Sequence, residues 1–270
     1  MEKIGLIAGN RKFPLLFAEA AKKNGLNIVA IAIKGETSRK LKSLADKVYW
    51  IGLDEFRRMF EIFKAEGISK VVMAGQITPR RLFSKELARS EEIKTLLAEI
   101  KNKKADTIFG AVAQRLKDEG LELLDSTLFL KDFLPQQGIL TKREPDFSIR
   151  ADIDFGLILA KAVAGLDIGQ TVAVKDKAIV AVEALEGTDN LIRRAGKITP
   201  GVTIVKVSKP NQDLRFDIPV VGLNTIRRLI KAKARCLAIE AGKTLFIDRE
   251  ESARLADARG ICIVAAHKNS

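Results

Sequence analysis

The chemistry of this chain has to come from carboxylate, amide, hydroxyl and guanidinium groups. Its 270 residues include one histidine, His267, and two cysteines, Cys236 and Cys262, each of which lies in an apolar run. No C-x-x-C pair, G-x-S-x-G elbow or G-x-x-x-x-G-K-[ST] loop occurs. The sequence therefore excludes a histidine-rich dinuclear metal site and argues against thiol catalysis. It favours a hard cation such as Mg²⁺ acting on phosphate.

The densest polar stretch covers residues 209–219 and shows no hydrophobic period. Arg215 can bind phosphate oxygens in a bidentate way, and Lys209 adds a point charge. Asp213 and Asp217 can hold Mg²⁺ directly or through its waters, or orient an attacking water. A surface loop of salt bridges is the alternative. We predict catalytic roles for Asp213, Arg215 and Asp217, metal binding by Asp213 and Asp217, and substrate contacts from Lys209 and Gln212.

Two shorter polar stretches lie where a predicted helix and a predicted strand begin. A strand that ends in carboxylates leads through Gly187 and Thr188 into a helix start, where free N–H groups suit a phosphate. Capping of that helix by Thr188 is the alternative. Gln170 ends a turn that begins at Asp167 and that is, on its own, an ordinary polar turn. The predicted substrate contacts in these stretches are Gln170, Gly187, Thr188 and Asp189.

Two loops that contain glycine follow predicted strands in the first third of the chain. The loop at Gly9 lacks G-x-G-x-x-G spacing, which disfavours NAD and leaves another nucleotide open. The loop at Gly75 follows a strand at the edge where open α/β sheets bind ligands. An ordinary solvated loop is the alternative. The predicted substrate contacts here are Gly9, Asn10, Gly75 and Gln76.

Apolar runs of strand length alternate with segments in which apolar residues recur at helical spacing. This alternation predicts the strands and helices that position these loops. In the first half we predict strands at 4–8, 28–33, 47–51, 70–74 and 121–124, with helices from about residue 14 to 25, at 54–66 with Asp54 as its cap, and at 86–102 and 106–119. In the second half we predict helices at 153–164, 189–195, 225–233 and 249–259 and strands at 171–174, 178–183, 203–207, 236–239, 244–247 and 261–265.

The alternation predicts an α/β fold with two domains. We expect an N-terminal Rossmann-like domain with a parallel sheet at residues 1–133. Residues 134–150, with two prolines and no period, are expected to form a linker. A distinct C-terminal catalytic α/β domain is expected at 151–270.

The formal net charge of +13 predicts a positive field that attracts an anionic partner. One Trp, one Tyr and the lack of an RNP, zinc-finger or KH signature argue against nucleic acid. The chain has no apolar run of membrane-spanning length and no signal-peptide pattern, so we expect a cytoplasmic protein.

Taken together, several short segments of the sequence resemble one family, the UDP-2,3-diacylglucosamine pyrophosphatases of the LpxI type. The resemblance runs through Gly5-Leu6-Ile7-Ala8-Gly9, Ala74-Gly75-Gln76, Asp167-Ile168-Gly169-Gln170, Glu186-Gly187-Thr188-Asp189, Gln212-Asp213-Leu214-Arg215-Phe216-Asp217-Ile218-Pro219 and Glu240-Ala241-Gly242. One departure is Arg11, which follows Asn10 where the family often has a second glycine.

The resemblance implies a Rossmann-like domain followed by a distinct α/β domain, and a Mg²⁺-dependent hydrolysis in lipid A biosynthesis. The expected substrate is the UDP-diacylglucosamine glycolipid, and the expected products are UMP and 2,3-diacylglucosamine 1-phosphate. A lipid substrate and the positive net charge together predict that the protein contacts the anionic inner face of the cytoplasmic membrane peripherally. The oligomeric state stays open. The competing functions are a nucleotide-dependent oxidoreductase and a basic protein that binds nucleic acid or lipid surfaces.

Overall fold

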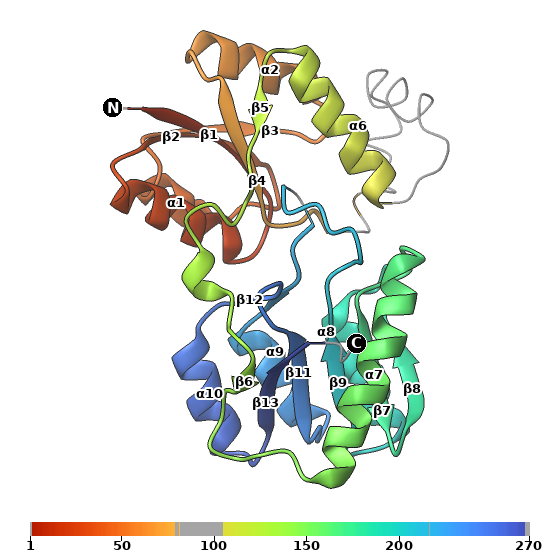
Figure 1. Ribbon diagram of the computed structural model, residues 1–270. Helices are drawn as coiled ribbons and strands as arrows, with labels where there is room; N and C mark the ends of the chain where they lie inside the picture. The colour runs from red at the N-terminus through yellow and green to blue at the C-terminus, as the bar shows by residue number, and fades with distance from the viewer. Residues whose placement is uncertain (1, 79–80, 82–104, 216, 268–270) are drawn as a thin grey trace. The chain divides into compact units, whose positions relative to one another are not determined.

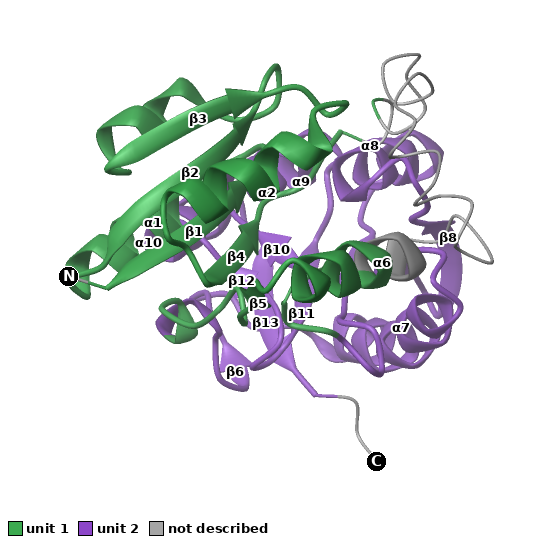
Figure 2. Ribbon diagram, turned by 90° about the horizontal axis from the view of Figure 1, so that it is seen from above, with its two compact units in different colours: residues 1–131, 213–217 green, residues 132–212, 218–270 purple. Residues whose placement is uncertain are grey.

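The computed structural model describes residues 2–78, 81, 105–215 and 217–267 (Figure 1). Its contacts divide the chain into two compact units (Figure 2). Unit 1 contains residues 1–131 and 213–217, and unit 2 contains residues 132–212 and 218–270. The predicted helix at 86–102 lies outside the described residues.

Unit 1 is built on a five-stranded parallel sheet with the strand order β3-β2-β1-β4-β5. Its strands are β1 (Lys3–Ala8), β2 (Asn27–Ile33), β3 (Lys47–Ile51), β4 (Lys70–Ala74) and β5 (Glu122–Leu123). Its helices are α1 (Phe13–Lys23), α2 (Phe56–Ala65), α6 (Ala105–Asp118) and a 3₁₀ turn at Arg39–Ser43.

Both faces of this sheet are covered, because consecutive apolar side chains of its central strands point to opposite faces. Val29, Ile31 and Ile33 of β2 pack in one cluster with α2 and α6. The intervening residues of β2 are also buried, and α1 contacts β1, β2 and β4. The result is the doubly wound architecture predicted from the alternation of strands and helices.

Unit 2 is built on a six-stranded mixed sheet with the order β6-β13-β11-β9-β7-β8. Its strands are β6 (Gly138–Ile139), β7 (Thr171–Lys175), β8 (Ala178–Val182), β9 (Thr203–Lys206), β11 (Cys236–Glu240) and β13 (Cys262–Ala266), and β10 (Val220–Val221) pairs separately with β12 (Leu245–Phe246). Its helices are α7 (Phe147–Gly165), α8 (Thr188–Ile198), α9 (Leu223–Lys231) and α10 (Arg249–Asp257), and a 3₁₀ turn spans Lys131–Phe133.

The helices of unit 2 form a layer on each face of the sheet (Figure 1). One apolar cluster joins α7 to Val172, Val205 and Cys236. The other joins α8, α9 and α10 to the alternate residues of the same strands, such as Ala173 and Ile204. Because consecutive side chains of a strand point to opposite faces of the sheet, the position of a residue in its strand decides which helix layer its side chain contacts.

The structure differs from the predicted elements in three places. The residue before α2 is Glu55, and its side chain makes no capping hydrogen bond. The prediction that Asp54 caps this helix was therefore wrong. Helix α7 begins six residues before the predicted start, because Asp146 caps it by accepting a hydrogen bond from the Ile149 N–H at 2.9 Å. The expected linker at 134–150 also contains β6, which pairs antiparallel with β13.

Candidate functional site

The loops that follow β1 and β4 lie together at the carboxyl edge of the unit 1 sheet. The Gly9 N–H donates to the Ala74 carbonyl, and the Asn10 N–H donates to the Gln76 carbonyl, both at 2.8 Å. A Cβ on Gly9 would lie 2.6 Å from the Gln76 carbonyl oxygen, and Gly75 has φ +87°. The structure thus brings together the four residues predicted as substrate contacts in this unit. Their engaged N–H groups are not an open phosphate cradle, which disfavours a dinucleotide cofactor bound in the usual way.

Glu36 holds these loops together and was missed by sequence reasoning. Its Oε2 accepts hydrogen bonds from Asn10 Nδ2 at 2.5 Å, Thr78 N at 3.2 Å and Thr78 Oγ1 at 2.9 Å. The Glu36 side chain is 2% exposed, and Arg81 Nη1 lies 3.8 Å from its Oε1. The only sequence signal was a polar residue shortly after an apolar strand.

A second polar group lies at the carboxyl edge of the unit 2 sheet, on the face covered by α8. Lys206, the last residue of β9, donates to Thr188 Oγ1 at 2.8 Å and to Thr171 Oγ1 at 3.3 Å. Thr188 donates to Glu183 Oε1 at 2.9 Å, and Lys206 Nζ lies 3.8 Å from Glu183 Oε2. The buried Lys206 ammonium therefore lies at the first turn of α8, beside the Glu183 carboxylate. Lys206 was missed, because it ends an apolar strand.

Lys209 is buried beside the predicted turn at 167–170. Its Nζ is 2.5 Å from Asp167 Oδ1, and its side chain is 9% exposed. Gln212 Oε1 accepts a hydrogen bond from the Lys209 N–H at 2.9 Å, while the Val207 N–H donates to the Gln170 carbonyl at 2.9 Å. Predicted contacts Gln170, Lys209 and Gln212 therefore belong to one connected region of unit 2.

On the α7 face of the same edge, Lys161 pairs with Glu240 at 2.6 Å. The Ser208 N–H and Oγ both donate to Glu240 Oε2 at 2.8 Å. Burial raises the pKa of Glu240, but the hydrogen bonds from Lys161 and Ser208 outweigh it and hold the pKa below its ordinary value. Strand alternation explains why Glu240 faces α7, since Cys236 and Ala238 pack there too.

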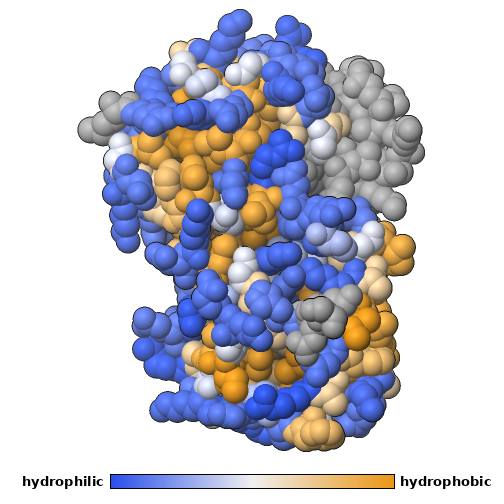
Figure 3. All heavy atoms as spheres, viewed as in Figure 1, coloured by the Kyte–Doolittle hydropathy of each residue, from blue (hydrophilic) through white to orange (hydrophobic). Residues whose placement is uncertain are grey.

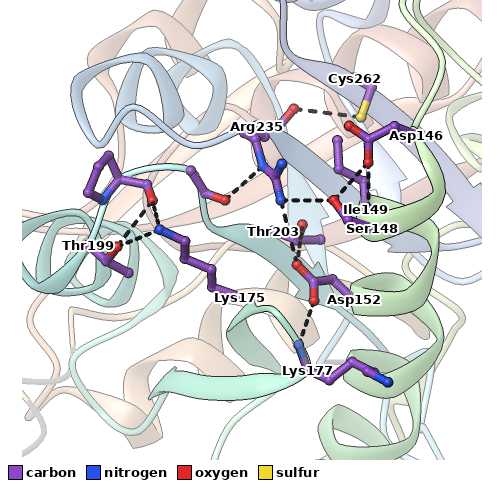
Figure 4. Close-up of polar contacts among 12 residues, drawn as sticks. Asp146, Ser148, Ile149, Asp152, Lys175, Lys177, Thr199, Thr203, Arg235 and Cys262 are labelled. Carbon is purple, nitrogen blue, oxygen red and sulfur yellow. Dashed lines mark hydrogen bonds and ion pairs between the residues drawn. The ribbon is translucent and has the colours of Figure 1, made fainter.

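The opposite edge of the unit 2 sheet carries a different network, shown in Figure 4. Asp152 is fully buried and accepts a hydrogen bond from the Lys177 N–H at 2.8 Å. Arg235 Nη2 lies 4.0 Å from Asp152 and its Nε donates to the Gly201 carbonyl at 3.0 Å. These bonds tie α7 to the strand ends, so we interpret this edge as structural.

The segment from Asp213 to Asp217 is counted with unit 1, whereas Gly187, Thr188 and Asp189 belong to unit 2. Ser126 donates to the Leu214 carbonyl through its N–H at 3.0 Å and its Oγ at 2.8 Å. Arg215 pairs with Asp213 at 2.6 Å. Hydrogen bonding by Arg215 lowers the pKa of Asp213, and the same bond raises the pKa of Arg215. Asp217 donates through its N–H to the Asp213 carbonyl at 3.4 Å.

No group of three or more His, Cys, Asp or Glu side chains that could hold a metal ion occurs among the described residues. Mg²⁺ does not require such a cage, since it usually keeps several waters and takes one or two carboxylates together with phosphate oxygens. Asp213 and Asp217 are oxygen donors of the kind that fit this type of binding.

The fold and these polar groups define a two-domain α/β protein, in which a carboxylate near the carboxyl end of a parallel strand is paired with a cation in each unit. Family models described as the LpxI N-terminal domain and the LpxI C-terminal domain match residues 3–133 and 136–264. The chain belongs to the LpxI family.

A relative named UDP-2,3-diacylglucosamine pyrophosphatase LpxI, from Caulobacter vibrioides, is 30% identical over 277 residues, covering 98% of this chain and 97% of that protein. Among solved structures, an ADP-bound biotin carboxylase domain of a thermophilic 2-oxoglutarate carboxylase shows 15% identity and a TM-score of 0.25 over 64% of this chain. The biotin carboxylase subunit of a pyruvate carboxylase shows 15% identity and 0.27 over 69%. This chain spans only 35% and 39% of those two chains.

Proposed function

We propose that this protein hydrolyses the pyrophosphate bond of UDP-2,3-diacylglucosamine and releases UMP and 2,3-diacylglucosamine 1-phosphate in lipid A biosynthesis. The observation that carries the proposal is the match to the Caulobacter relative along nearly the whole length of both chains. Both LpxI domains are matched as well. The hydrolysis of a pyrophosphate needs positioning and charge neutralisation rather than a covalent nucleophile.

Lys209 and Arg215 are the proposed contacts to phosphate oxygens. Both cations are already paired with a carboxylate, Lys209 with Asp167 and Arg215 with Asp213. These pairs hold the ammonium and guanidinium groups in place before substrate arrives, which reduces the ordering that binding requires. A phosphate then competes with the carboxylate for the same donors, and Gln212 adds an amide.

Thr188 is proposed to orient the attacking water rather than to donate to phosphate. An ionised carboxylate only accepts and an ammonium only donates, so the single Thr188 hydroxyl hydrogen points to Glu183 while Lys206 donates to its oxygen. The second lone pair of the Thr188 oxygen is shared between Thr171 Oγ1, 3.4 Å away, and the proposed water, which would donate to it. Gln170, Gly187 and Asp189 are proposed as further substrate contacts around this helix start.

Mg²⁺ is proposed as the cofactor, and Asp213 and Asp217 are the residues that would hold it. The ion would supply neutralisation of charge on the pyrophosphate. The support is the chemistry of the donor set: two carboxylates in one short segment next to a guanidinium, in a chain with a single histidine. We propose that Asp213, Arg215 and Asp217 are the catalytic residues.

The test is release of UMP from UDP-2,3-diacylglucosamine by the purified protein, with and without Mg²⁺. Asp213→Ala and Asp217→Ala should abolish release while the folded structure and substrate binding persist. Asp154→Ala, which removes an exposed carboxylate from the outer side of α7, is the matched control and should keep full activity. Full turnover by both test variants would remove the assignment, and no UMP from the unaltered protein would remove the function.

Peripheral contact with anionic membrane at its cytoplasmic face is proposed as the way in which the enzyme reaches its glycolipid. In the described residues no helix is long and apolar enough to cross a bilayer. Unit 2 exposes Ile158 on α7 and Leu166 and Ile168 just after it, and apolar surface is visible in Figure 3. Exposed apolar side chains on a protein of net charge +13 suit a surface that is both apolar and anionic.

A further inference from the structure

The chain leaves the unit 2 sheet just before Lys209. Strand β9 ends at Lys206, where its pairing with β7 and β11 also ends. The Val207 N–H still donates to the Gln170 carbonyl, next to β7, at 2.9 Å. A chain that has passed the end of its strand no longer has the hydrogen bonds of the sheet to hold it. The position of Lys209 therefore depends on side chains from other elements.

Two largely buried side chains hold Ser208, which is itself fully buried. Glu240 Oε2, at the end of β11, accepts from the Ser208 N–H and from its Oγ, both at 2.8 Å. Lys161 Nζ, near the end of α7, donates to the Ser208 carbonyl at 2.9 Å and to its Oγ at 3.1 Å. Lys161 and Glu240 also pair with each other at 2.6 Å. The backbone is therefore held on both sides of the Ser208 Cα.

The peptide group between Ser208 and Lys209 is bonded at both of its polar atoms. Its carbonyl accepts from Lys161, and its N–H donates to Gln212 Oε1 at 2.9 Å. Rotation of this peptide group would break both hydrogen bonds. Residue 210 is a proline, which disfavours helical backbone in the residue before it. The direction in which the Lys209 side chain leaves the backbone is therefore fixed.

The end of α7 also holds the side chain of Lys209. Asp167, two residues after the helix ends, lies 2.5 Å from Lys209 Nζ through its Oδ1. The last helical residue is Gly165, where a Cβ would lie in ordinary contact with Pro210, 3.5 Å from its Cγ. Lys161 is one helical turn before Gly165. One end of one helix thus holds Lys209 at its backbone and at its ammonium group.

Stability alone does not call for a buried ion pair at this place. Replacing such a pair by neutral side chains of similar size is often neutral or stabilising. The Lys161–Glu240 pair directs its hydrogen bonds to the residue before Lys209, which is a proposed phosphate contact. An ammonium group that is already held in place loses less freedom when a phosphate binds.

We propose that Lys161 and Glu240 are positioning residues that act through Lys209 and fix the place where its ammonium group meets the phosphate oxygens of the substrate. This proposal rests on the proposed function, in which Lys209 contacts phosphate. Neither Lys161 nor Glu240 was among the substrate contacts predicted from the sequence.

The test separates positioning from stability by comparing urea unfolding with calorimetric binding of inorganic pyrophosphate. Lys161→Met leaves Glu240 buried without its cation, so both stability and affinity should fall. The neutral pair, Lys161→Met with Glu240→Gln, removes both charges, so most of the lost stability should return. Its affinity for pyrophosphate and its kcat/KM for the glycolipid should stay about tenfold or more below those of the unaltered protein, because methionine cannot donate to the Ser208 carbonyl.

Lys209→Met shows whether the pair acts through Lys209. This variant should lose at least as much affinity for pyrophosphate as the neutral pair does. Adding the neutral pair to Lys209→Met should change affinity by less than about twofold, because residues that act through one group are not additive. Lys243→Met is the matched control: it removes an exposed cation 3.7 Å from Glu240 Oε1 and should bind pyrophosphate as before.

Three results would overturn the proposal. Affinity could return together with stability in the neutral pair, the effects of Lys209→Met and the neutral pair could add, or pyrophosphate could fail to bind the unaltered protein. Pyrophosphate binding that depends on Lys209 and on the pair, without any release of UMP from the glycolipid, would instead contradict the proposed function.

Discussion

At the residue scale, unit 2 pairs three largely buried lysines with three different carboxylates. Lys161, Lys206 and Lys209 have side chains between 8% and 15% exposed. Taking an ion out of water costs several kcal/mol, and a buried pair recovers that cost only when its geometry is good. All three pairs lie near the carboxyl edge of the unit 2 sheet, where the substrate contacts of this unit are proposed.

The Lys161–Glu240 pair leads to a prediction about pH. Because the folded state lowers the pKa of Glu240, ionised Glu240 contributes stability above its unfolded pKa, and this contribution is lost as pH falls through the folded pKa. In the Lys161→Met variant, the lysine no longer offsets the burial of Glu240, and we expect burial to raise the pKa of this carboxyl group. We expect the variant to lose about 3–5 kcal/mol of unfolding free energy at pH 7, and to lose less as pH falls toward about 4 and Glu240 takes up a proton.

Urea unfolding of the Lys161→Met variant across this pH range measures the effect. Lys243→Met is the control, because Lys243 lies 3.7 Å from the same carboxylate but is 49% exposed. An exposed pair contributes roughly 0–1 kcal/mol, so this variant should barely change stability. Equal losses in the two variants would contradict the assignment of the pKa shift to Lys161.

At the element scale, turns and close approaches decide where the loops lie. Gly75 has φ +87°, and a Cβ there would lie 2.6 Å from the Asn10 carbonyl oxygen and 2.9 Å from Pro14. The loops after β1 and β4 can meet only because neither Gly9 nor Gly75 carries a side chain.

We expect Gly75→Ala to cost more than Gly25→Ala. Both glycines have positive φ, +87° and +77°, so both variants pay a similar conformational cost. Only Gly75 also meets backbone atoms, whereas nothing lies within 4 Å of a Cβ on Gly25. Thermal unfolding should show an additional loss of about 1–3 kcal/mol for Gly75→Ala. Equal losses would mean that the two loops move apart freely.

Most of the strands and helices could be predicted from the sequence, but only part of the side-chain contacts at the candidate site. The strand at 70–74 and the start of the strand at 171 match the structure to the residue, because each apolar run is bounded by polar turn residues. The predicted start of α7 was too late, because its first turn places an apolar residue, Phe147, on the exposed side and a charged residue, Arg150, next to the buried Ile149.

The site contacts were harder to predict, because they join residues distant in the sequence. Glu36 lies 26 residues from Asn10 and 42 from Thr78, and no local pattern marks such a pairing. Lys206 looks like the end of an apolar strand until the pairing of β9 with β7 places it beside Thr171. By contrast, the four residues of the two glycine loops could be predicted as substrate contacts, because each loop directly follows a strand of an open α/β sheet.

At the scale of the whole molecule, positive charge and exposed apolar side chains lead to a prediction about lipid surfaces. Purified protein should sediment with vesicles that contain anionic lipid, and rising salt should weaken this binding because charges are screened beyond about 10 Å at 0.1 M. The double variant Ile158→Asp, Leu166→Asp should lose most of the binding. Ile198→Asp changes an equally exposed side chain at the end of α8 and should bind as before.

Binding that is the same to neutral and anionic vesicles, or unaffected by the double variant, would contradict the peripheral membrane contact.

Unit 1 is not one continuous piece of the chain. Unit 1 ends at residue 131 but includes Asp213–Asp217, whose Leu214 carbonyl accepts both hydrogen bonds from Ser126. A gene cut after codon 131 would encode a fragment without the peptide that completes it, and the remaining piece would carry that peptide as a foreign loop. Supplying the peptide in trans, or moving the chain ends by circular permutation, is the way to obtain an intact half.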